Sequence, residues 1–405
     1  MATKILRRRF AAPQNDMIPT FSTPRIAFVL DTLPSIGGGE KVLFAALEAY
    51  PRADIFTLIY NRKVFVNSPI ANRKVNTSWL DSLPFAHTHH RYLLPLMPSA
   101  IEQINLSGYD TIVSFHYAVA NGARTPHGAH HVSYTHTPLR YAWTNINING
   151  KHTRRNFLLD RYMRSFRAWD RRAASRVHAM ATNSHTVRER IREAYQLEAK
   201  VIHPPVEVTR FRPSLKRENY FITVTRLVPH KRVDLLVRAF NQLNLPLVIV
   251  GDGPEQPRLK AMANSNIRLL GFQSDEKVAE LLGNARAFVC AAEEDFGIAI
   301  VEAQAAGCPV IAYGAGGALE TVEEGVTGLF FAEQTEASLI ETFHRFEKLN
   351  QTFDAREIKK RAERFNKARF LDEFREFVSG EPKRVFLKGV EKNLSHREHR
   401  VHRDF

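Results

Sequence analysis

The sequence has little of several features that define large classes of protein. It has two cysteines among 405 residues, Cys290 and Cys308, and each stands in an apolar run with no metal-ligand spacing between them. We therefore expect reduced, buried thiols of the kind found in cytosolic proteins, without a disulfide framework. No apolar run approaches the roughly 18–20 residues that cross a bilayer. Residues 1–23 carry a basic cluster with no apolar segment after it, which argues against a secretion signal.

Acidic residues are also in deficit. The chain has 57 Lys and Arg against 42 Asp and Glu, which gives a formal net charge of +15. This balance favours polyanionic partners, namely nucleic acid, anionic lipid or phosphorylated substrates, with a generally basic surface as the alternative. We expect a cytoplasmic protein that in addition can rest on the inner face of the plasma membrane.

The residues that are present describe a globular chain of two domains. Hydrophobic residues make up 44% of the sequence and aromatic residues 10%, and 405 residues are many for a single core. Short apolar strands are predicted at 24–30, 54–60, 109–116, 130–136 and 178–184. Helical patterns such as 40–49 lie between several of them. This alternation predicts parallel β-α units in a doubly wound α/β sheet.

The same pattern starts again after a Pro-rich linker at 203–213. Strands are predicted at 219–227, 245–251, 266–271, 287–292 and 309–313, with helices such as 233–243 and 275–283 between them and further helices over 336–378. We divide the chain into a basic tail (1–23), an N-terminal Rossmann-like domain (24–207), a C-terminal Rossmann-like domain (208–355), a C-terminal helix (356–380) and a second basic tail (381–405).

Residues 293–317, EEDFGIAIVEAQAAGCPVIAYGAGG, carry the most specific pattern. Glu294 and Glu302 stand eight positions apart, at the entrance of a predicted helix and two turns into it, so they face roughly the same side. A strand and a glycine loop at 314–317 follow. Two carboxylates and a loop rich in backbone N–H groups suit a ligand with sugar hydroxyls and phosphate oxygens.

This segment resembles the E-x7-E signature of retaining glycosyltransferases of family 4, which have the GT-B fold of two Rossmann-like domains facing a central cleft. The resemblance covers residues 24–378. It implies that Glu294 lies near the donor sugar and that Glu302 binds the ribose of a nucleotide. Asp295 departs from the family, whose members commonly have glycine there. It also implies that the N-terminal domain is on the acceptor side and that the last helix crosses back to it.

A second element, Thr225 to Lys231, resembles the family's R-L-x-x-x-K motif. In the family its Arg and Lys grip the donor diphosphate, which implies that role for Arg226 and Lys231. Fixed cations of this kind can stabilise a departing diphosphate as a metal does. No two Asp residues stand two positions apart, so the D-x-D metal motif of the other large glycosyltransferase fold is absent. We therefore expect no metal and no cofactor beyond the nucleotide-sugar substrate.

The N-terminal half supplies two further resemblances. The loop Gly37 to Glu40 is similar to the family's N-domain glycine loop near the diphosphate, and His136 stands where members carry a His that reaches the donor sugar. The remaining predicted donor-binding residues are Gly38, Gly39, Gly271, Phe272, Phe296, Gly297, Ile298, Gly316 and Gly317. We predict that Gly316 and Gly317 offer N–H groups to the sugar or distal phosphate. For Asn183-Ser184, acceptor binding and helix capping remain equal alternatives.

The run His136 to Trp143, HTPLRYAW, resembles a bacterial subgroup that acts as mannosyltransferases in surface-polysaccharide assembly, although Thr144 stands where that subgroup has Asp. Residues 151–176 form a basic stripe with apolar positions at helical spacing. This stripe either docks on its own domain or contacts a membrane surface. Six residues are candidates for the acceptor or membrane surface: Arg140, Tyr141, Arg154, Arg155, Arg161 and Arg164.

These features predict a retaining, metal-independent glycosyltransferase that moves mannose from GDP-mannose to a lipid-linked or surface-polysaccharide glycan. The predicted catalytic residues are Glu294, His136, Arg226 and Lys231. One alternative is a UDP-sugar-dependent enzyme of the same fold. A basic nucleic-acid-binding protein is an alternative of another class, but no recognition module is present and we expect no nucleic-acid partner. A Rossmann oxidoreductase lacks support, because no G-x-G-x-x-G follows the first strand. A catalytically inactive relative of the family is a further alternative, but all the cations and carboxylates named above are present.

Overall fold

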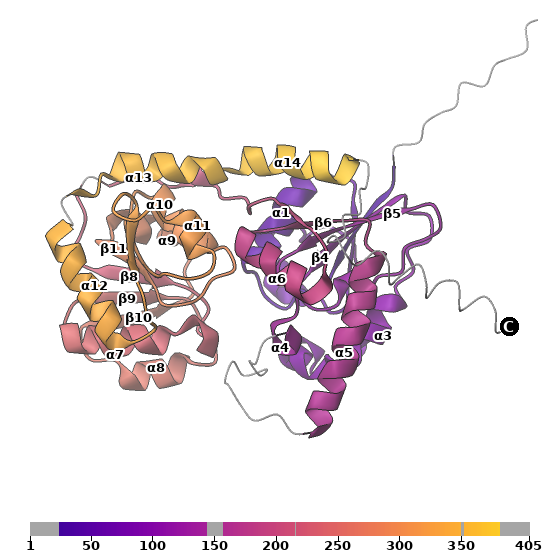
Figure 1. Ribbon diagram of the computed structural model, residues 1–405, viewed down its shortest axis with the longest axis horizontal. Coiled ribbons are helices and arrows are strands. Elements are labelled where there is room, and N and C mark those ends of the chain that lie inside the picture. Colours follow the sequence, from indigo (N-terminus) through magenta and orange to yellow (C-terminus); the bar gives the residue numbers. More distant parts are fainter. Residues whose placement is uncertain (1–23, 144–156, 215, 350–351, 381–405) are drawn as a thin grey trace, which may run out of the picture.

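The computed structural model describes residues 24–143, 157–214, 216–349 and 352–380. Within these ranges the chain forms two parallel sheets, which lie side by side as two lobes (Figure 1). The N-terminal sheet has the order β3 (Val75–Thr77), β2 (Asp54–Thr57), β1 (Ile26–Leu30), β4 (Thr111–His116), β5 (His130–Thr135), β6 (Ala179–Thr182) and β7 (Lys200–Val201). The C-terminal sheet has the order β10 (Ile267–Gly271), β9 (Leu247–Val250), β8 (Phe221–Val224), β11 (Ala287–Cys290), β12 (Val310–Tyr313) and β13 (Gly328–Phe331).

Helices connect the strands of each sheet, as the alternating pattern predicts. The N-terminal lobe contains α1 (Gly38–Ala49), α2 (Ala86–His89), α3 (Met97–Glu102), α4 (Arg140–Trp143), α5 (Phe157–Arg176) and α6 (His185–Tyr195). The C-terminal half contains α7 (Val233–Leu243), α8 (Gln256–Met262), α9 (Asp275–Asn284), α10 (Ile298–Ala305), α11 (Ala318–Thr321), α12 (Glu336–Leu349), α13 (Ala355–Ala362) and α14 (Lys367–Ser379). The predicted doubly wound α/β architecture with two Rossmann-like units is confirmed. Among the described helices, none has the length and apolarity to cross a membrane.

The strand order of each sheet determines where a ligand would meet it. In the N-terminal sheet the order reverses between β1 and β4, and in the C-terminal sheet between β8 and β11. Ligands of open parallel sheets bind beyond the carboxyl ends of the strands at such switch points. The glycine loop follows β1, Arg226 and Lys231 follow β8, and Glu294 follows β11. The topology therefore places all these predicted residues at the ligand-binding edges of their sheets.

The last helix, α14, belongs spatially to the N-terminal lobe. In Figure 1, α13 and α14 run along the top of the molecule from the C-terminal lobe to the N-terminal lobe. Phe370 and Phe374 of α14 are fully buried in the N-terminal core. The Phe374 ring lies 6.1 Å from that of Phe115 in β4 and 6.2 Å from that of Tyr50. The last described helix, α14, thus completes the core of the N-terminal lobe.

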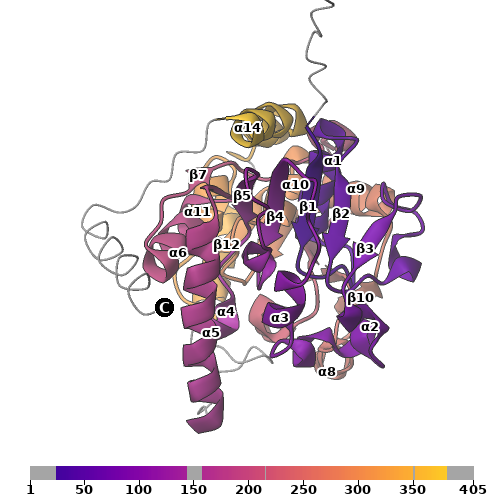
Figure 2. The same cartoon turned by 90° about the vertical axis from the view of Figure 1, so that its right-hand side faces the viewer.

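The helix of the basic stripe, α5, uses its apolar side for packing. Met163 and Phe166 are buried in the N-terminal core, and Trp169 packs partly against it. Trp169 Nε1 also donates a hydrogen bond to Glu102. One end of α5 projects beyond the rest of the lobe (Figure 2). Of the two alternatives for this stripe, docking on its own domain accounts for these apolar side chains, and residues 151–156 lie outside the described part.

The structure contains elements that the sequence did not predict. The short strands β3, β7 and β13 are absent from the predicted set, and they lie at the sheet edges. Several predicted strands are longer than the observed ones, because residues such as Thr225 and Arg226 lie in the loop after the strand and not in the sheet. Cys290 and Cys308 are buried and free, as expected. The two terminal segments, 1–23 and 381–405, lie outside the described residues.

Candidate active site at the boundary of the two lobes

Lys231 and Glu294 meet across two strand ends of the C-terminal lobe. Lys231 closes a short 3-10 turn after β8, η6 (Pro229–Lys231), and Glu294 lies in the loop after β11. The Lys231 ammonium donates to both carboxylate oxygens of Glu294, at 2.7 and 2.6 Å. Both side chains are less than one fifth exposed. The pair places one fixed cation and one fixed carboxylate side by side at the ligand-binding edge.

Arg226 lies near this pair but forms no ion pair with any carboxylate in the described ranges. Its charge acts on groups from both lobes. Burial, together with the charges of Lys231, Arg140 and Arg226, lowers the pKa of His230 to about 4. Burial raises the pKa of Glu40 in the N-terminal lobe, and Arg226 acts in the opposite direction. Arg226 is therefore a cation between the lobes whose charge is available to an anionic ligand.

Glu302 is a buried carboxylate inside α10, with its side chain 8% exposed. It accepts a hydrogen bond from Lys41 of α1 at 2.5 Å and one from Arg210 at 3.2 Å. Lys41 belongs to the N-terminal lobe, so this contact joins the lobes. The sequence did not predict Lys41 or Arg210 as site residues. The one available signal was that Lys41 directly follows the glycine loop.

The glycine loop and His136 lie together on the N-terminal side of this boundary. A Cβ atom built on Gly39 would be 3.5 Å from His136 Nε2, and one on Gly38 would be 3.2 Å from the Ile298 side chain of the other lobe. A larger residue at Gly38 would therefore press on α10. Burial lowers the pKa of His136 to about 4, although nearby Asp295 favours its charged form. His136 is thus a neutral imidazole near pH 7.

Asp295 forms ion pairs with two arginines of the N-terminal lobe, Arg140 and Arg190. Arg190 also binds Glu293, at 2.7 Å. The carboxyl pKa of Asp295 is lowered, because Arg140 and Arg190 outweigh the effect of burial. The residue that departs from the family glycine is therefore an interdomain bridge. Arg190 was not predicted, because nothing in the local pattern of α6 distinguishes it from the other arginines of that helix.

The second glycine loop supports Glu294 through the backbone. Gly316 has φ of +63°, and a Cβ there would be 2.4 Å from the Glu294 carbonyl oxygen. The Gly317 N–H donates to that same oxygen at 2.8 Å. Glycine is needed at Gly316 because both the backbone angle and the close approach exclude a side chain. The Gly317 N–H is thus already bonded to Glu294, and its predicted donation to a ligand stays a prediction.

The other predicted donor residues divide into two groups. Gly271 with φ of +67° and Phe272, which is 77% exposed, stand at the end of β10 and leave a ring open to a ligand. Phe296, in contrast, is 2% exposed and packs against the rings of His203 and Phe365. The Phe296 side chain lies in the core, so a donor would meet this residue through its backbone, and the predicted donor contact stays a prediction. Gly297, with φ of +90°, forms the N-cap of α10.

The candidates for the acceptor or membrane surface do not form one group. Arg140 belongs to the interdomain bridge, and Tyr141 is partly buried next to it. Arg161 and Arg164 are exposed on α5. Arg154 and Arg155 lie outside the described residues. In the Asn183-Ser184 pair, Ser184 caps α6 by accepting from Val187 N, and Asn183 donates to the His136 carbonyl, so capping accounts for Ser184.

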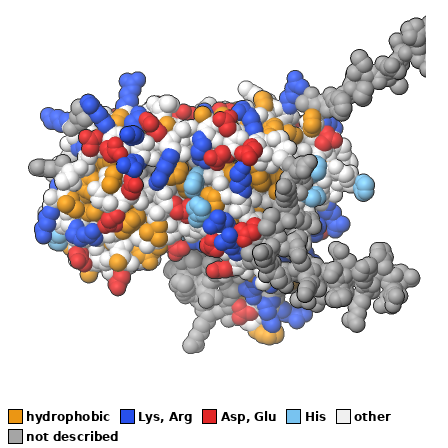
Figure 3. Space-filling view, turned by 45° about the horizontal axis from the view of Figure 1, so that its top comes forward, with side chains coloured by type: hydrophobic (Ala, Val, Ile, Leu, Met, Phe, Trp, Pro, Cys, Tyr) orange, Lys and Arg blue, Asp and Glu red, His pale blue; other side chains and the backbone are white. Residues whose placement is uncertain are grey.

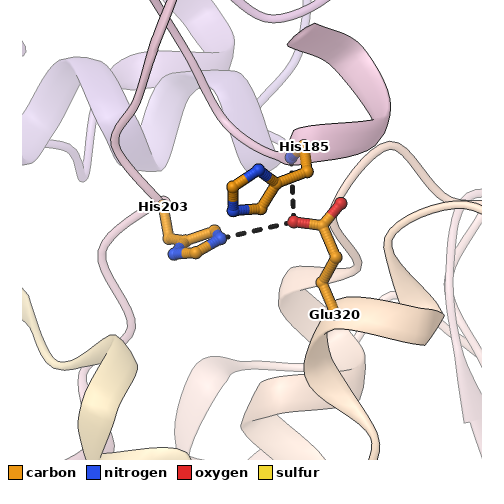
Figure 4. Close-up of side chains that lie close together, drawn as sticks. All are labelled: His185, His203 and Glu320. Atoms are coloured by element: carbon orange, nitrogen blue, oxygen red, sulfur yellow. Dashed lines mark hydrogen bonds and ion pairs between the residues drawn. The ribbon is translucent and has the colours of Figure 1, made fainter. Parts of the chain in front are cut away.

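His185, His203 and Glu320 lie close together beside α6 (Figure 4), with candidate ligand atoms within 4.8 Å of one another. The Glu320 oxygens accept from the backbone N–H groups of His185 and Thr186, each at 2.8 Å. Glu320 of the C-terminal lobe therefore caps the first turn of an N-terminal-lobe helix. A metal ion at this position would face the positive end of the α6 dipole. We assign the group as an interdomain cap rather than a metal centre.

Two parallel α/β lobes with cations and carboxylates between them define the GT-B architecture of nucleotide-sugar enzymes. The family model described as Glycosyltransferase Family 4 matches residues 36–210, and the model described as Glycosyl transferases group 1 matches residues 207–368. Together they account for both lobes. The chain belongs to the GT-B glycosyltransferases of the family 4 type, as the sequence resemblance implied.

Individual relatives match over shorter segments. A GDP-mannose-dependent alpha-mannosyltransferase of Corynebacterium glutamicum is 40% identical over 107 residues, 26% of this chain and 26% of that protein. A GDP-mannose-dependent alpha-(1-6)-phosphatidylinositol monomannoside mannosyltransferase of Mycolicibacterium smegmatis is 32% identical over 177 residues, 36% of this chain and 46% of that protein. The chain thus spans less than half the length of these curated relatives.

Solved structures share the fold over most of the chain. Sucrose-phosphate synthase of Thermosynechococcus elongatus has a TM-score of 0.69 at 17% identity and covers 87% of this chain and 97% of its own. The Anabaena protein HepE in complex with UDP and glucose has a TM-score of 0.67 at 19% identity and covers 89% of this chain and 100% of its own. At these identities the likeness establishes the fold alone.

Proposed function

We propose that the protein is a retaining hexosyltransferase that moves mannose from GDP-mannose to a hydroxyl of a lipid-linked or surface-polysaccharide glycan, without a metal. The observation that carries this proposal is the convergence of Arg226, Lys231, Glu294 and Glu302 at the boundary of the lobes. The names of the Corynebacterium and Mycolicibacterium relatives support the choice of donor.

The proposed roles follow from the charges at this boundary. Arg226, which has no carboxylate partner in the described part of the chain, receives the diphosphate together with Lys231. Lys231 can give up its bond to one Glu294 oxygen and bind the phosphate instead. Glu294 then has an oxygen that can accept a hydrogen bond from a sugar hydroxyl. As the sugar leaves, negative charge grows on the diphosphate, and two fixed cations lower the energy of that state.

We assign Glu302 to the ribose of the nucleotide. Its Oε1 accepts hydrogen bonds from both Lys41 and Arg210, and these two cations hold the carboxylate in position. A carboxylate accepts several hydrogen bonds, so the ribose hydroxyls can donate to the other oxygen while these bonds are kept.

His136 takes part as a neutral ring. Because burial lowers its pKa to about 4, it offers one N–H donor and one acceptor to sugar hydroxyls at neutral pH. It therefore orients the sugar and does not supply a positive charge. With no enzymic nucleophile assigned, the acceptor hydroxyl attacks the face from which the diphosphate departs, and a phosphate oxygen accepts its proton. This course retains the anomeric configuration.

A UDP-sugar is the second candidate donor, since the Anabaena protein HepE has been solved with UDP, with UDP and glucose, and with UDP-glucose. A nucleic-acid partner has less support. On the face shown in Figure 3, Lys and Arg side chains are mixed with Asp and Glu and do not form one positive surface. Extended single-sign patches are the electrostatic feature of nucleic-acid binding.

A nucleotide panel tests the proposal. The thermal stability of the protein is measured with GDP, UDP, ADP, GDP-mannose and UDP-glucose, each with EDTA and with Mg²⁺. A ligand that binds only the native state raises the unfolding temperature by mass action. We expect the largest increase with GDP and GDP-mannose, and equal increases with EDTA and with Mg²⁺. A larger increase with UDP would overturn the donor, and dependence on Mg²⁺ would overturn the metal-free mechanism.

A further inference from the structure

One segment of the N-terminal lobe exposes several large apolar side chains. It comprises the 3-10 turn η2 (Trp79–Ser82), α2, the 3-10 turn η3 (His90–Leu93) and the start of α3, and these elements pack on one another. Phe85 is 76% exposed, Tyr92 68%, and Trp79 and Leu96 43% each. We call Trp79, Phe85, His89, Tyr92 and Leu96 the aromatic patch. Four large apolar side chains in so short a segment exceed the scattered exposure of an ordinary surface.

Ring contacts make the centre of the patch continuous. The His89 ring lies 6.2 Å from that of Phe85 and 6.1 Å from that of Tyr92, and it stacks on Tyr92. Figure 2 shows α2 and α3 together at the end of the N-terminal lobe away from α14. The patch therefore presents one surface and not separate residues.

Phe85 has an unfavourable backbone conformation at its exposed position. Its φ is +62°, the left-handed conformation that favours glycine, and it is the N-cap of α2. An exposed ring gains no packing energy that would compensate for this conformation within the isolated protein. Strained backbone at an exposed apolar tip is typical of a segment that acts on a partner.

The charges around the patch favour an anionic partner. Residues 82–101 contain no Asp or Glu. Asp81 is paired with His87 Nε2 at 3.0 Å and accepts a bond from Tyr60 N. Arg91 is exposed within the segment, and Arg62 and Lys63 are exposed just after Tyr60. Aromatic rings and His among exposed cations are the composition that interfacial lipid headgroups attract.

His90, the residue after His89, responds to the charge of the candidate active site. Burial together with Arg91 and Arg226 lowers its pKa to about 4. Arg226 belongs to the diphosphate-binding pair proposed above, so η3 lies within electrostatic reach of the donor phosphates. A surface on which the patch rests would thus bring its own glycan headgroups toward the donor.

We propose that the aromatic patch docks the protein on an anionic lipid bilayer, with Phe85 and Tyr92 inserted among the headgroups. This inference rests on the proposed function in one respect, because the lipid surface would carry the acceptor. Met163 and Phe166 of α5 are buried in the protein itself and take no part in this docking.

Vesicle flotation tests the proposal. The full chain is mixed with vesicles of phosphatidylcholine alone or of phosphatidylcholine with phosphatidylglycerol. We expect binding to the anionic vesicles, and a loss of about tenfold or more in the Phe85→Ser/Tyr92→Ser variant. Phe157→Ser is the matched control, because Phe157 is an aromatic residue of the same lobe, 72% exposed, on α5. We expect this variant to bind like the wild type.

A single substitution separates lipid contact from structural effects. In Phe85→Gly the positive φ is retained without strain, so we expect an unchanged or higher unfolding temperature together with weaker vesicle binding. Loss of both stability and binding would assign Phe85 a structural role and overturn the proposal. Equal vesicle binding by all variants, or a loss confined to Phe157→Ser, would also overturn it.

Two further readouts distinguish the other outcomes. If the Phe85→Ser/Tyr92→Ser variant changes the oligomeric state in size-exclusion chromatography, the occupant is a second copy of the chain and the lipid proposal fails. Thermal shifts with GDP and UDP on the same samples report on the proposed function separately. Nucleotide binding without vesicle binding rejects the patch alone, and vesicle binding without nucleotide binding rejects the transferase function alone.

Discussion

Arg226 and Glu302 differ in what they contribute to the resting protein, although both are assigned to the donor. Arg226 has no ion pair with any described carboxylate. Glu302 is buried between Lys41 and Arg210 and joins the two lobes. Substitution of Arg226 therefore tests ligand binding almost alone, whereas substitution of Glu302 tests binding and the interdomain contact together.

We expect Arg226→Ala to lower the rate of sugar transfer by roughly 100-fold or more, because a fixed cation at a developing charge contributes on this scale. Its unfolding temperature should stay close to that of the wild type. Glu302→Ala should lose transfer to a similar extent and also unfold at a lower temperature. Transfer is measured with labelled donor, and Glu324→Ala, an exposed carboxylate of the same lobe, serves as the control. Near-normal transfer by either variant would contradict the site assignment.

Asp170 is a buried carboxyl group in the N-terminal lobe, outside the active site. Trp143 Nε1 and the Tyr195 hydroxyl donate to its Oδ2, at 2.8 and 2.9 Å. Burial raises its pKa from 3.8 to about 7, although these two bonds act against the increase. Ionisation is therefore harder in the folded state than in the unfolded state. The stability that Asp170 contributes is present in full below pH 3.8 and is lost as the pH rises through about 7.

Asp170→Asn should remove this pH dependence, because an amide stays neutral while still accepting both bonds. We compare the free energy of unfolding of the variant with that of the wild type at pH 5 and at pH 8. The difference, variant minus wild type, should be larger at pH 8 by on the order of 3 kcal/mol. Urea denaturation at the two pH values measures the difference. An equal difference at both pH values would show that Asp170 is already ionised at pH 5.

At the scale of elements, α14 is the clearest case of a helix whose position in sequence and in space disagree. Its Phe374 is fully buried in the N-terminal core, where the rings of Phe115 and Phe370 stack on it. Phe346 of α12 is equally buried, but in the core of the C-terminal lobe. The two phenylalanines form a matched pair, one for each lobe.

Phe374→Ala should destabilise the protein by about 3–5 kcal/mol, the usual effect of removing a buried aromatic side chain. Hydrogen exchange followed by mass spectrometry should show the loss of protection in β1, β4 and β5, more than 200 residues earlier in the chain. Phe346→Ala should deprotect β8 and β9 instead. Loss of protection in the C-terminal sheet of Phe374→Ala would contradict the assignment of α14 to the N-terminal lobe.

The sequence predicted most elements but few of the contacts between them. Apolar runs such as 245–251 and 287–292 identify strands because a strand buried on both faces must be apolar throughout. The partners of Glu302 and Asp295 could not be read this way. Lys41, Arg190 and Arg210 come from separate segments, and their side chains converge only when the two lobes are placed. The burial of the Phe296 side chain could not be read from the sequence either, because the residue stands inside the motif assigned to the donor.

At the scale of the whole molecule, charged contacts join the lobes where the site lies. Asp295 bridges to Arg140 and Arg190, Glu302 to Lys41, and Glu320 caps α6. The side chains of the Asp295 bridge are about one quarter exposed. Salt should therefore screen this bridge in part, and we expect the relative position of the lobes to respond to ionic strength.

Asp295→Gly restores the residue common in the family and removes the bridge. We expect a larger radius of gyration in small-angle X-ray scattering at low salt, and a smaller response to added salt than in the wild type. Glu347→Ala breaks an ion pair with Arg286 inside the C-terminal lobe and should change neither quantity. An unchanged radius of gyration in Asp295→Gly would mean that the other interdomain contacts suffice to hold the lobes.

The placement of α14 has a consequence for how the protein is made. Ribosomes release a chain from its N-terminus at about 5–20 residues per second, and domains usually fold in that order. Here the first sheet emerges early, but its core lacks Phe370 and Phe374 until the last described helix leaves the ribosome. The C-terminal lobe is complete before then. We therefore expect the N-terminal lobe to begin folding first and to finish last, with an uncovered apolar surface that chaperones can bind during synthesis.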